Sequence, residues 1–450
     1  MSFSGKNNKI KKGIYWLLNN VSFSRGDKFL FFFMLTLPVI NALADSTIYY
    51  FVEPDKESGM HPGIIRGIIL IIFIFLFGFK RIKNERPSPY IIVFLAYLFI
   101  LTLFSSDIRY SFMSGYIKWF IPLMMYPVGM YFIRRIDSLA LLIKIYIFGA
   151  MIVCINLLIA QFTGYGISAY VEKSFYTGGA GVGITNQLAL VILTYPFVLR
   201  QRGKMRMAGR LFIYTVGLLS IVFIFLAMKR AAIISLLSGS VIFVYNTQSK
   251  VRFIRYFAII VLAGYLVFPV FKDIITERYN ARMKQMENIE KEARYQEFFF
   301  VLKEFKEGNI GQKLFGKELF NSGAHFGMKY FHTPRMIHSD MSGFLYGSGI
   351  TGIMLYLSIY YFLFMEGLKY SRHLRKDGTY RELFAIYFAI LFATFLVSAT
   401  GSGTIGERCL VFMLLGAVAG LTREKMKSEV INKKQINGSI PPDIRQGKEI

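Results

Sequence analysis

Cysteine is nearly absent from the chain, and its two occurrences do not build a site. Cys154 and Cys409 both lie inside apolar runs, without a CxxC spacing and without neighbouring histidine or aspartate ligands. Thiol-based metal and redox motifs need such neighbours. We therefore expect both cysteines to pack in the interior of the protein.

Acidic residues are also scarce, because 27 Asp and Glu accompany 53 Lys and Arg, which gives a formal charge of +26. In a soluble protein this charge would point to a nucleic-acid partner. However, 54% of the residues are hydrophobic and the mean hydropathy is +0.45, which is more apolar than an ordinary globular domain. The composition argues for a membrane protein, and the positions of the basic residues decide what their charge means.

The first 28 residues are polar and basic and lack the apolar core and cleavage site of a signal peptide. Beyond them lie about twelve apolar stretches near the length that crosses roughly 30 Å of hydrocarbon. They occupy 29–50, 63–79, 89–105, 115–133, 139–162, 183–199, 211–228, 231–246, 253–271, 343–366, 381–402 and 405–422. The predicted fold class is therefore all-α, a polytopic transmembrane bundle of about twelve helices.

Lys and Arg gather in alternate connections between these stretches, and cytoplasmic loops carry such an excess. Both termini are therefore expected in the cytoplasm. Because most of the positive charge marks topology, no single basic face is left to bind nucleic acid. The basic segments are 1–28, 80–86, 134–135, 200–210, 250–252, 369–376 and the tail from 423.

A long polar segment from about 272 to 342 is expected outside, and it far exceeds a typical connection. Within it, 283–307 lacks Pro and Gly and has apolar residues at helical spacing, which predicts an amphipathic helix across the outer mouth of the bundle. The part from 308 to 334 is rich in glycine and aromatics and is expected to be loop. The predicted domains are a basic tail (1–28), helices 1–9 (29–271), an extracytoplasmic catalytic loop (272–342), helices 10–12 (343–422) and a second basic tail (423–450).

Ionisable residues are nearly absent from the interiors of the predicted spans, whereas pumps and transporters usually carry them at membrane depth. Candidate functional residues collect instead at the outer face. Lys229 and Arg230 form a charged turn there, where few cations are expected. The alternative interpretation is that both side chains reach toward lipid headgroups.

Two further candidates belong to the outer segment. Arg294 lies on the expected loop helix, near Glu290 and Glu297, in an arrangement that is also typical of a solvated helix face. His338 lies in a polar turn where the chain re-enters the membrane, with Asp340 two residues later. Because histidine has an ordinary pKa near 6.5, it suits proton transfer. We expect His338 to act as a general base that Asp340 orients.

The order of these residues resembles the O-antigen polymerase and O-antigen ligase superfamily of bacterial membrane glycosyltransferases, most strongly between about 180 and 365. IHSDMSGFLYGSGITGIMLYL is similar to its pattern of His, a polar pair and Gly-x-x-Gly before a transmembrane helix. MKRAAIISLLSG is similar to its Ser-Arg-Gly-Ala helix start, with Lys229 and Ala231 in place of serine and glycine. GAGVGITNQLALVILTYPFVL is similar to the family's Gly- and Asn-rich entry to an earlier helix, through Gly183, Asn186 and Ala189.

The resemblance implies a GT-C type enzyme in the bacterial inner membrane, with a polyprenyl-diphosphate-linked glycan as donor and a glycan or lipid-linked acceptor. By motif match, Arg230 and Arg294 would bind the diphosphate, and His338 would act at the acceptor. From their positions beside these residues, we add Lys229 to the diphosphate-binding group and Asp340 to the catalytic group. Apart from the resemblance, a departing diphosphate needs cationic donors, and arginine matches phosphate oxygens with a fork of N–H groups. Two arginines can replace a metal, and no acidic cluster with metal-ligand spacing occurs on the outer side. No cofactor is expected.

The sequence leaves three functional classes open. An enzyme of this kind is a polymerase if it accepts another carrier-linked repeat unit, or a ligase if it accepts a lipid-A core or a protein; the modest central part of the outer loop favours the polymerase. A flippase or exporter would show charged or broken helices along a central path. A non-catalytic scaffold would use the loop only as a binding surface. For the enzyme, other polysaccharide-assembly proteins are candidate partners.

Reporter fusions after Gly203 and after Gly323 test the predicted topology. We expect the first fusion to report the cytoplasm and the second the opposite compartment, because 200–210 is a basic connection and Gly323 lies in the outer segment. The same compartment for both fusions would contradict the predicted orientation.

Overall fold

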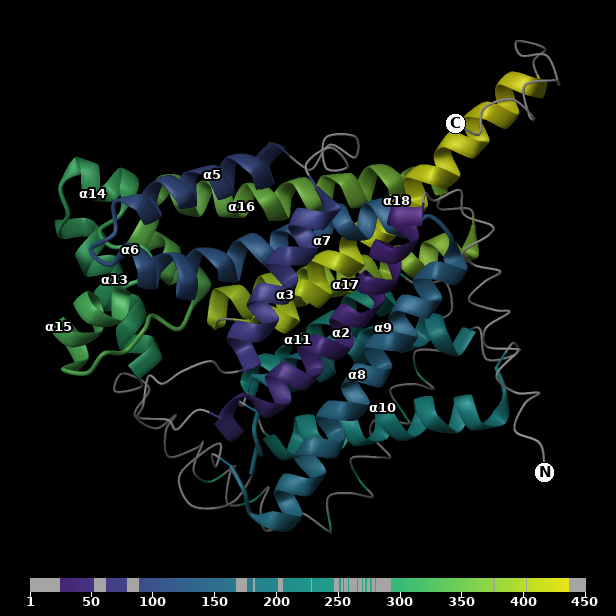
Figure 1. Ribbon diagram of the computed structural model, residues 1–450, viewed down its shortest axis with the longest axis horizontal. Coiled ribbons are helices and arrows are strands. Elements are labelled where there is room, and N and C mark those ends of the chain that lie inside the picture. The colour runs from purple at the N-terminus through teal and green to yellow at the C-terminus, as the bar shows by residue number, and fades with distance from the viewer. Residues whose placement is uncertain are drawn as a thin grey trace.

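The computed structural model describes residues 25–51, 62–78, 89–166, 176–180, 183–200, 205–227, 229–246, 293–374, 377–401 and 403–436, and isolated positions between 251 and 280. Most of these residues are helical, and the rest lie in turns, bends and irregular segments, apart from one isolated β-bridge between Gly166 and Gly178. The all-α class is therefore confirmed. The long helices lie side by side in a bundle (Figure 1).

Eleven labelled helices make up the described part of this bundle. They are α2 (Arg25–Phe51), α3 (Pro62–Phe77), α5 (Pro89–Leu103), α7 (Ile117–Phe132), α8 (Ile136–Thr163), α9 (Ile184–Arg200), α10 (Met207–Ala227), α11 (Arg230–Asn246), α16 (Asp340–Leu374), α17 (Gly378–Thr400) and α18 (Ile405–Ile436). The short α6 (Ile108–Tyr110) and the π-helical η1 (Ser111–Tyr116) lead into α7. Every expected apolar stretch coincides with one of these helices except 253–271, which lies almost wholly outside the described residues.

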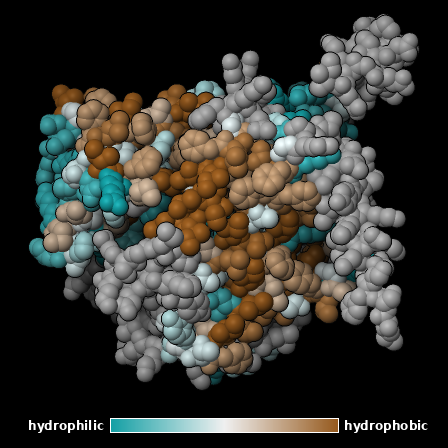
Figure 2. Space-filling model, in the orientation of Figure 1, coloured by the Kyte–Doolittle hydropathy of each residue, from teal (hydrophilic) through white to brown (hydrophobic). Residues whose placement is uncertain are grey.

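Six of the described helices are long and apolar enough to cross a membrane, namely α2, α8, α10, α16, α17 and α18. Helices α3, α5, α9 and α11 are apolar but shorter. A helix satisfies its own backbone N–H and C=O groups, which hydrocarbon requires of any segment that crosses it. Figure 2 shows apolar residues gathered over the middle of the bundle and hydrophilic residues toward its two ends, at the left and at the upper right of the view. The protein thus has membrane character, and the expected count of about twelve crossings stays a prediction.

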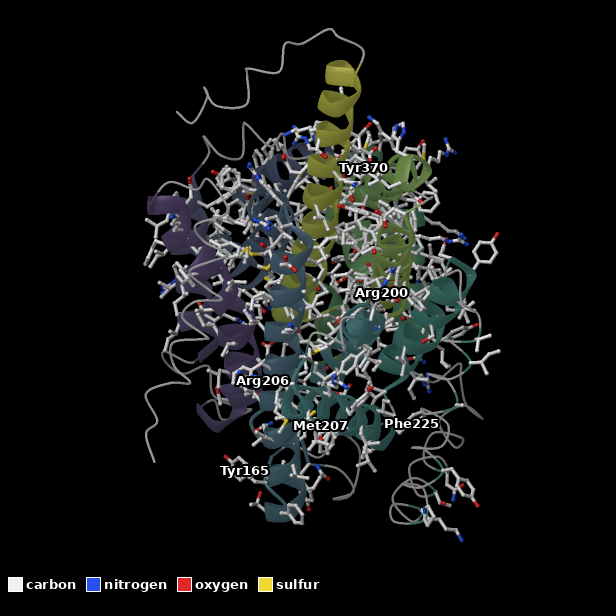
Figure 3. The ribbon with its side chains drawn as sticks, turned by 90° about the vertical axis from the view of Figure 1, so that its right-hand side faces the viewer. Tyr165, Arg200, Arg206, Met207, Phe225 and Tyr370 are labelled. Carbon is white, nitrogen blue, oxygen red and sulfur yellow. The ribbon has the colours of Figure 1, made fainter. Side chains whose placement is uncertain are left out.

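Hydrogen bonds show which helix ends lie together. Arg200, at the end of α9, donates at 2.9 Å both to the Gly378 carbonyl and to Glu382 at the start of α17. Arg381 donates at 3.1 Å to the carbonyl of Asn246, the last residue of α11. The end of α18 projects from this end of the bundle (Figure 1), and Figure 3 views the molecule from this side, with Arg200 labelled.

The opposite end of the bundle carries a small helical cap. It consists of α13 (Ala293–Glu307), α14 (Ile310–Phe315), the π-helical η4 (Gly323–Gly327) and α15 (Met328–Phe331). The predicted loop helix is confirmed for 293–307, and its first part lies outside the described residues. The expectation of loop from 308 to 334 is wrong in part, because three short helices occupy Ile310–Phe315, Gly323–Gly327 and Met328–Phe331. Asn309 caps the first of them through a reciprocal pair of hydrogen bonds with Gln312. Val301, Phe326 and Tyr346 form a second apolar core beneath these short helices.

Helix α16 is interrupted at Gly349, whose φ of 64° and ψ of −164° are not helical. A positive φ of this kind favours glycine. A β-carbon at Gly349 would lie 2.5 Å from the Leu314 carbonyl oxygen, and one at Gly316 would lie 2.2 Å from the carbonyl carbon of Gly347. The cap therefore lies directly against the backbone of α16, and the Lys317 N–H donates to the Tyr346 carbonyl at 2.9 Å.

Helices α7 and α18 pack along each other at unusually close range. A β-carbon at Gly416 would lie 2.0 Å from the Tyr126 carbonyl oxygen, and one at Gly420 would lie 2.3 Å from that of Met130. Gly416 and Gly420 have the small-xxx-small spacing that lets transmembrane helices approach. The contacts run in parallel register, so α7 ends on the same side of the bundle as Arg423 of α18.

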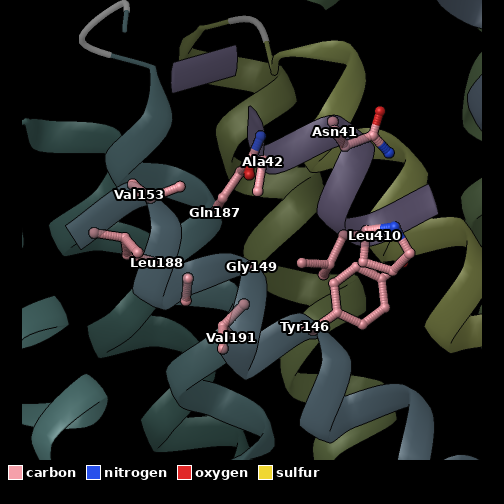
Figure 4. A pocket seen from close by; sticks show the side chains of 12 residues that line it. Asn41, Ala42, Tyr146, Gly149, Val153, Gln187, Leu188, Val191 and Leu410 are labelled. Carbon is pink, nitrogen blue, oxygen red and sulfur yellow. The ribbon is translucent and has the colours of Figure 1, made fainter. Parts of the chain in front are cut away.

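Ionisable side chains inside the expected spans are more common than the sequence analysis inferred, and that inference is wrong. Asp45 of α2 pairs with Arg66 of α3, and both residues are buried. Gln187 of α9 donates to Asp45 and, at 3.2 Å, to Thr404. The hydropathy of a sequence segment counts each charged residue as if it were alone. In the folded protein, Asp45 and Arg66 lie together, and their attraction offsets part of the free-energy cost of removing each charge from water. A cavity of about 10 Å³ beside Asn41 and Gln187 lies next to this network (Figure 4).

Candidate functional site

A cavity of about 410 Å³ lies between the cap and the bundle, and we call it the Arg230–His338 cavity. Four helices and one turn meet there. Its lining residues are Arg230, Ala231 and Ile234 of α11, Tyr295, Glu297 and Phe298 of α13, His338 and Ser339 of the turn, Ser342 of α16, and Ala399 and Thr400 of α17. Two of the residues singled out from the sequence, Arg230 and His338, therefore line the same space.

The Glu297 carboxylate contacts the turn that contains His338 through both of its oxygens. The His338 backbone N–H donates to Glu297 Oε1 at 2.6 Å, and the imidazole Nδ1 lies 3.1 Å from Glu297 Oε2. The Glu297 side chain is 3% exposed, whereas that of His338 is 43% exposed. The imidazole is thus anchored on one edge and open on the other.

Asp340 was expected to orient His338, and the structure gives it a different contact. Its Oδ1 accepts from Arg408 at 2.7 Å, and both side chains are buried. The guanidinium of Arg408 also lies over the ring of Trp119, 3.9 Å from its centroid. Asp340 therefore ties the start of α16 to α18, and the carboxylate bonded to His338 belongs to Glu297.

The remaining predicted site residues have different outcomes. Lys229 precedes α11 and does not line the Arg230–His338 cavity. Instead, it lies close enough to Glu407 to interact with its charge, and Glu407 also accepts from Asn186 at 3.1 Å. Arg294 belongs to α13 and immediately precedes the cavity-lining Tyr295, but its side chain lies outside the described residues.

The cavity combines a cation, a hydrogen-bonded imidazole and hydroxyl groups. The Arg230 guanidinium presents N–H donors suited to phosphate oxygens, and an imidazole held through Nδ1 can exchange a proton through Nε2. The hydroxyls of Ser339 and Ser342 and the rings of Tyr295 and Phe298 complete the lining. This set can bind an anion beside a group that removes a proton from a neighbouring hydroxyl.

Sequence reasoning missed Glu297 as a functional residue, because 41 positions separate it from His338. It was noted only as a neighbour of Arg294 on a helix surface. The available signal was its spacing, since Glu297 and Val301 lie four residues apart on the buried face of α13. A charge on the apolar side of an amphipathic helix usually has a partner.

No protein-family model matches the chain, and no curated protein matches it.

A second buried carboxylate on α13 fastens the cap that carries Glu297. Glu304 accepts hydrogen bonds from Lys317, Lys329 and Tyr330. Burial raises the pKa of Glu304, but these three hydrogen bonds outweigh it and lower the pKa to about 2. The ordinary pKa of glutamate is near 4.3, so the folded cap favours the ionised carboxylate.

Stability of the cap should consequently depend on pH through Glu304. Because the folded-state pKa is depressed, its contribution is fully present above about pH 4.5 and is lost as the pH falls toward about 2. We expect Glu304→Gln to lower the melting temperature of the purified protein at pH 7, with a difference from the wild type that shrinks as the pH falls below about 4.5. A difference that stays constant across this range would show that Glu304 does not act through its charge.

Proposed function

We propose that the protein is a membrane glycosyltransferase that transfers a glycan from a polyprenyl-diphosphate carrier to a hydroxyl of an acceptor glycan. Its preferred role is a polymerase of a bacterial surface polysaccharide of the O-antigen type. The observation that carries this proposal is the shared cavity, because Arg230 and His338, far apart in the sequence, line it together. A diphosphate-binding cation and a proton acceptor are the two groups that this reaction needs.

The reaction balances with these residues alone. The acceptor hydroxyl gives its proton to His338 Nε2 while its oxygen forms a bond to the anomeric carbon. The bond from that carbon to the diphosphate oxygen breaks, and the lipid diphosphate leaves with the electron pair. Arg230 stabilises the charge that develops on the leaving group, and Arg294 is proposed to add a second guanidinium from α13.

A second cavity supports an amphipathic donor. It has a volume of about 350 Å³ and is lined by apolar and aromatic residues of α11, α16 and α17, among them Ile242, Phe364 and Phe392. The same three helices contribute to the Arg230–His338 cavity. Along α11, Ile234 of one cavity and Ile242 of the other are about 12 Å apart. We propose that the isoprenoid chain follows this seam below the diphosphate.

We propose that the chain lies in the bacterial inner membrane and crosses it about twelve times. In this orientation the cap lies outside and both termini lie in the cytoplasm. It is supported by the arrangement of the described basic residues. Arg200 of α9 lies at the end of the bundle from which α18 projects, whereas the cap lies at the other end. This end would then face the cytoplasm, as the positive-inside rule expects for the basic segment 200–210 and the tail from 423.

Two alternatives lead to different products. A ligase would use the same chemistry with a lipid-A core or a protein as acceptor. A flippase would move the carrier-linked glycan without transfer, and the buried Asp45–Arg66 pair is a feature that transporters also carry.

A deletion strain distinguishes these functions by its surface glycan. For a polymerase we expect glycan capped with a single repeat unit, because attachment continues when chain growth fails. Polymer stranded on the lipid carrier would instead establish the ligase. Carrier-linked units retained on the cytoplasmic side would favour the flippase, and an unchanged glycan profile would contradict all three.

Purified variants test the residue roles with a lipid-linked donor. Arg230→Ala should lower transfer by about one to two decades, the equivalent of about 1.5–3 kcal/mol for a lost charge-assisted contact. Arg230→Lys should recover little, because an ammonium lacks the bidentate fork. His338→Ala should lower turnover by roughly 10²–10⁴-fold with donor binding and melting temperature retained.

The matched control is His332→Asn, because His332 has a φ of 55° that asparagine tolerates. Full activity in a well-folded His338→Ala protein would remove the proposed base. Full activity in Arg294→Ala would likewise contradict the proposal that Arg294 of α13 binds the diphosphate.

A further inference from the structure

Glu297 is a carboxylate almost completely withdrawn from solvent, with 2% of the residue exposed. Both of its oxygens are directed at His338, one to the backbone N–H and the other to the imidazole Nδ1. Burying a charge is costly unless it is paired and hydrogen-bonded. Arg335 supplies the opposite charge, because its Nη2 lies 3.6 Å from Glu297 Oε2.

The chemistry of the three groups decides which ring nitrogen carries the proton. An ionised carboxylate only accepts hydrogen bonds, and a guanidinium only donates them. Nδ1 lies 3.1 Å from Glu297 Oε2 and 3.4 Å from Arg335 Nη2. The shorter contact is with the acceptor, and the Arg335 guanidinium is also held over the Phe331 ring, 4.7 Å from its centroid. Nδ1 therefore donates, and the lone pair of the neutral ring resides on Nε2.

We infer that Glu297 is a positioning residue that fixes His338 in the Nδ1–H tautomer and turns Nε2 into the proton acceptor of the Arg230–His338 cavity. The tautomer is inferred from the contacts alone, and only the expected effect on glycan transfer rests on the proposed function. A carboxylate that fixes an imidazole tautomer in this way raises the effectiveness of a general base without itself touching the substrate.

Because Glu297 contacts His338 through both oxygens, replacing one oxygen by an NH₂ group should change which imidazole nitrogen carries the proton. In Glu297→Gln the single amide oxygen can accept from the His338 backbone N–H, which leaves the amide NH₂ facing Nδ1. Because NH₂ only donates, Nδ1 must then accept and the proton must move to Nε2. The substitution keeps the shape of the side chain and reverses the tautomer.

Glu304 offers a matched control on the same helix. It is also buried, at 4% exposed, and also accepts several hydrogen bonds, but its partners are Lys317, Lys329 and Tyr330. Glu304→Gln therefore removes a buried carboxylate from α13 while the contact between Glu297 and His338 stays intact.

The experiment reads the tautomer directly by nitrogen NMR of the full-length protein labelled with ¹⁵N-histidine. The chain has only five histidines, which are His61, His325, His332, His338 and His373. His338→Asn identifies the signals of His338 by their loss. Spectra are recorded at increasing pH until the signals of His338 no longer change, so that the neutral ring is observed.

The expected result is the Nδ1–H tautomer in the wild type and in Glu304→Gln, and the Nε2–H tautomer in Glu297→Gln. In the transfer assay, kcat of Glu297→Gln should fall by roughly 10²–10⁴-fold with KM nearly unchanged, as for loss of the base itself. Glu304→Gln should lose thermal stability and keep its tautomer.

An Nε2–H tautomer in the wild type, or the same tautomer in the wild type and Glu297→Gln, overturns the inference. If the wild type transfers no glycan at all but the tautomer reverses as expected, Glu297 is established as the positioning residue and the proposed function fails. Reversal of the tautomer with unchanged kcat overturns the catalytic consequence.

Discussion

The buried ion pair of Asp340 and Arg408 holds the start of α16 against α18, and the position of the cavity depends on it. Both side chains are less than a tenth exposed, so water does little to screen their attraction. Arg408 also lies over Trp119 of α7, and the Asp340 N–H donates to the Gly401 carbonyl at 3.0 Å. Four helices thus meet two residues after His338, and removal of one partner from such a pair typically costs about 3–5 kcal/mol.

The helices of the bundle can be predicted from the sequence, because a long apolar segment that crosses hydrocarbon has to form a helix or part of a closed barrel. A stretch such as 139–162 must satisfy its backbone internally, and it forms α8. The cap was harder to predict, since α14 depends on the local capping box of Asn309 rather than on hydropathy. Periodicity did place a helix over Ala293–Glu307, because apolar residues recur on one of its faces.

The candidate site was only partly accessible from the sequence for a related reason. Arg230 and His338 stood out because a cation and a histidine are unusual beside apolar segments, but their common cavity depends on how α11 packs against α17. Glu297 could not be assigned to His338, because its role arises from a tertiary contact across 41 positions. The same limit applied to Asp45 and Arg66, whose pairing depends on the packing of α2 against α3.

The interlocking of the cap with α16 narrows the sequence changes that this fold can accept. At the contact between Gly316 and Gly347 a β-carbon on the first residue would overlap the backbone of the second. Enlarging one side of a packed interface is usually rescued by trimming the other. Here both sides already have the smallest side chain, so no second-site change can make room. Substitutions in the cap should therefore be tolerated mainly at residues away from this contact. The glycines at Gly316, Gly347 and Gly349 should be retained together, because each lies against the backbone of the other segment.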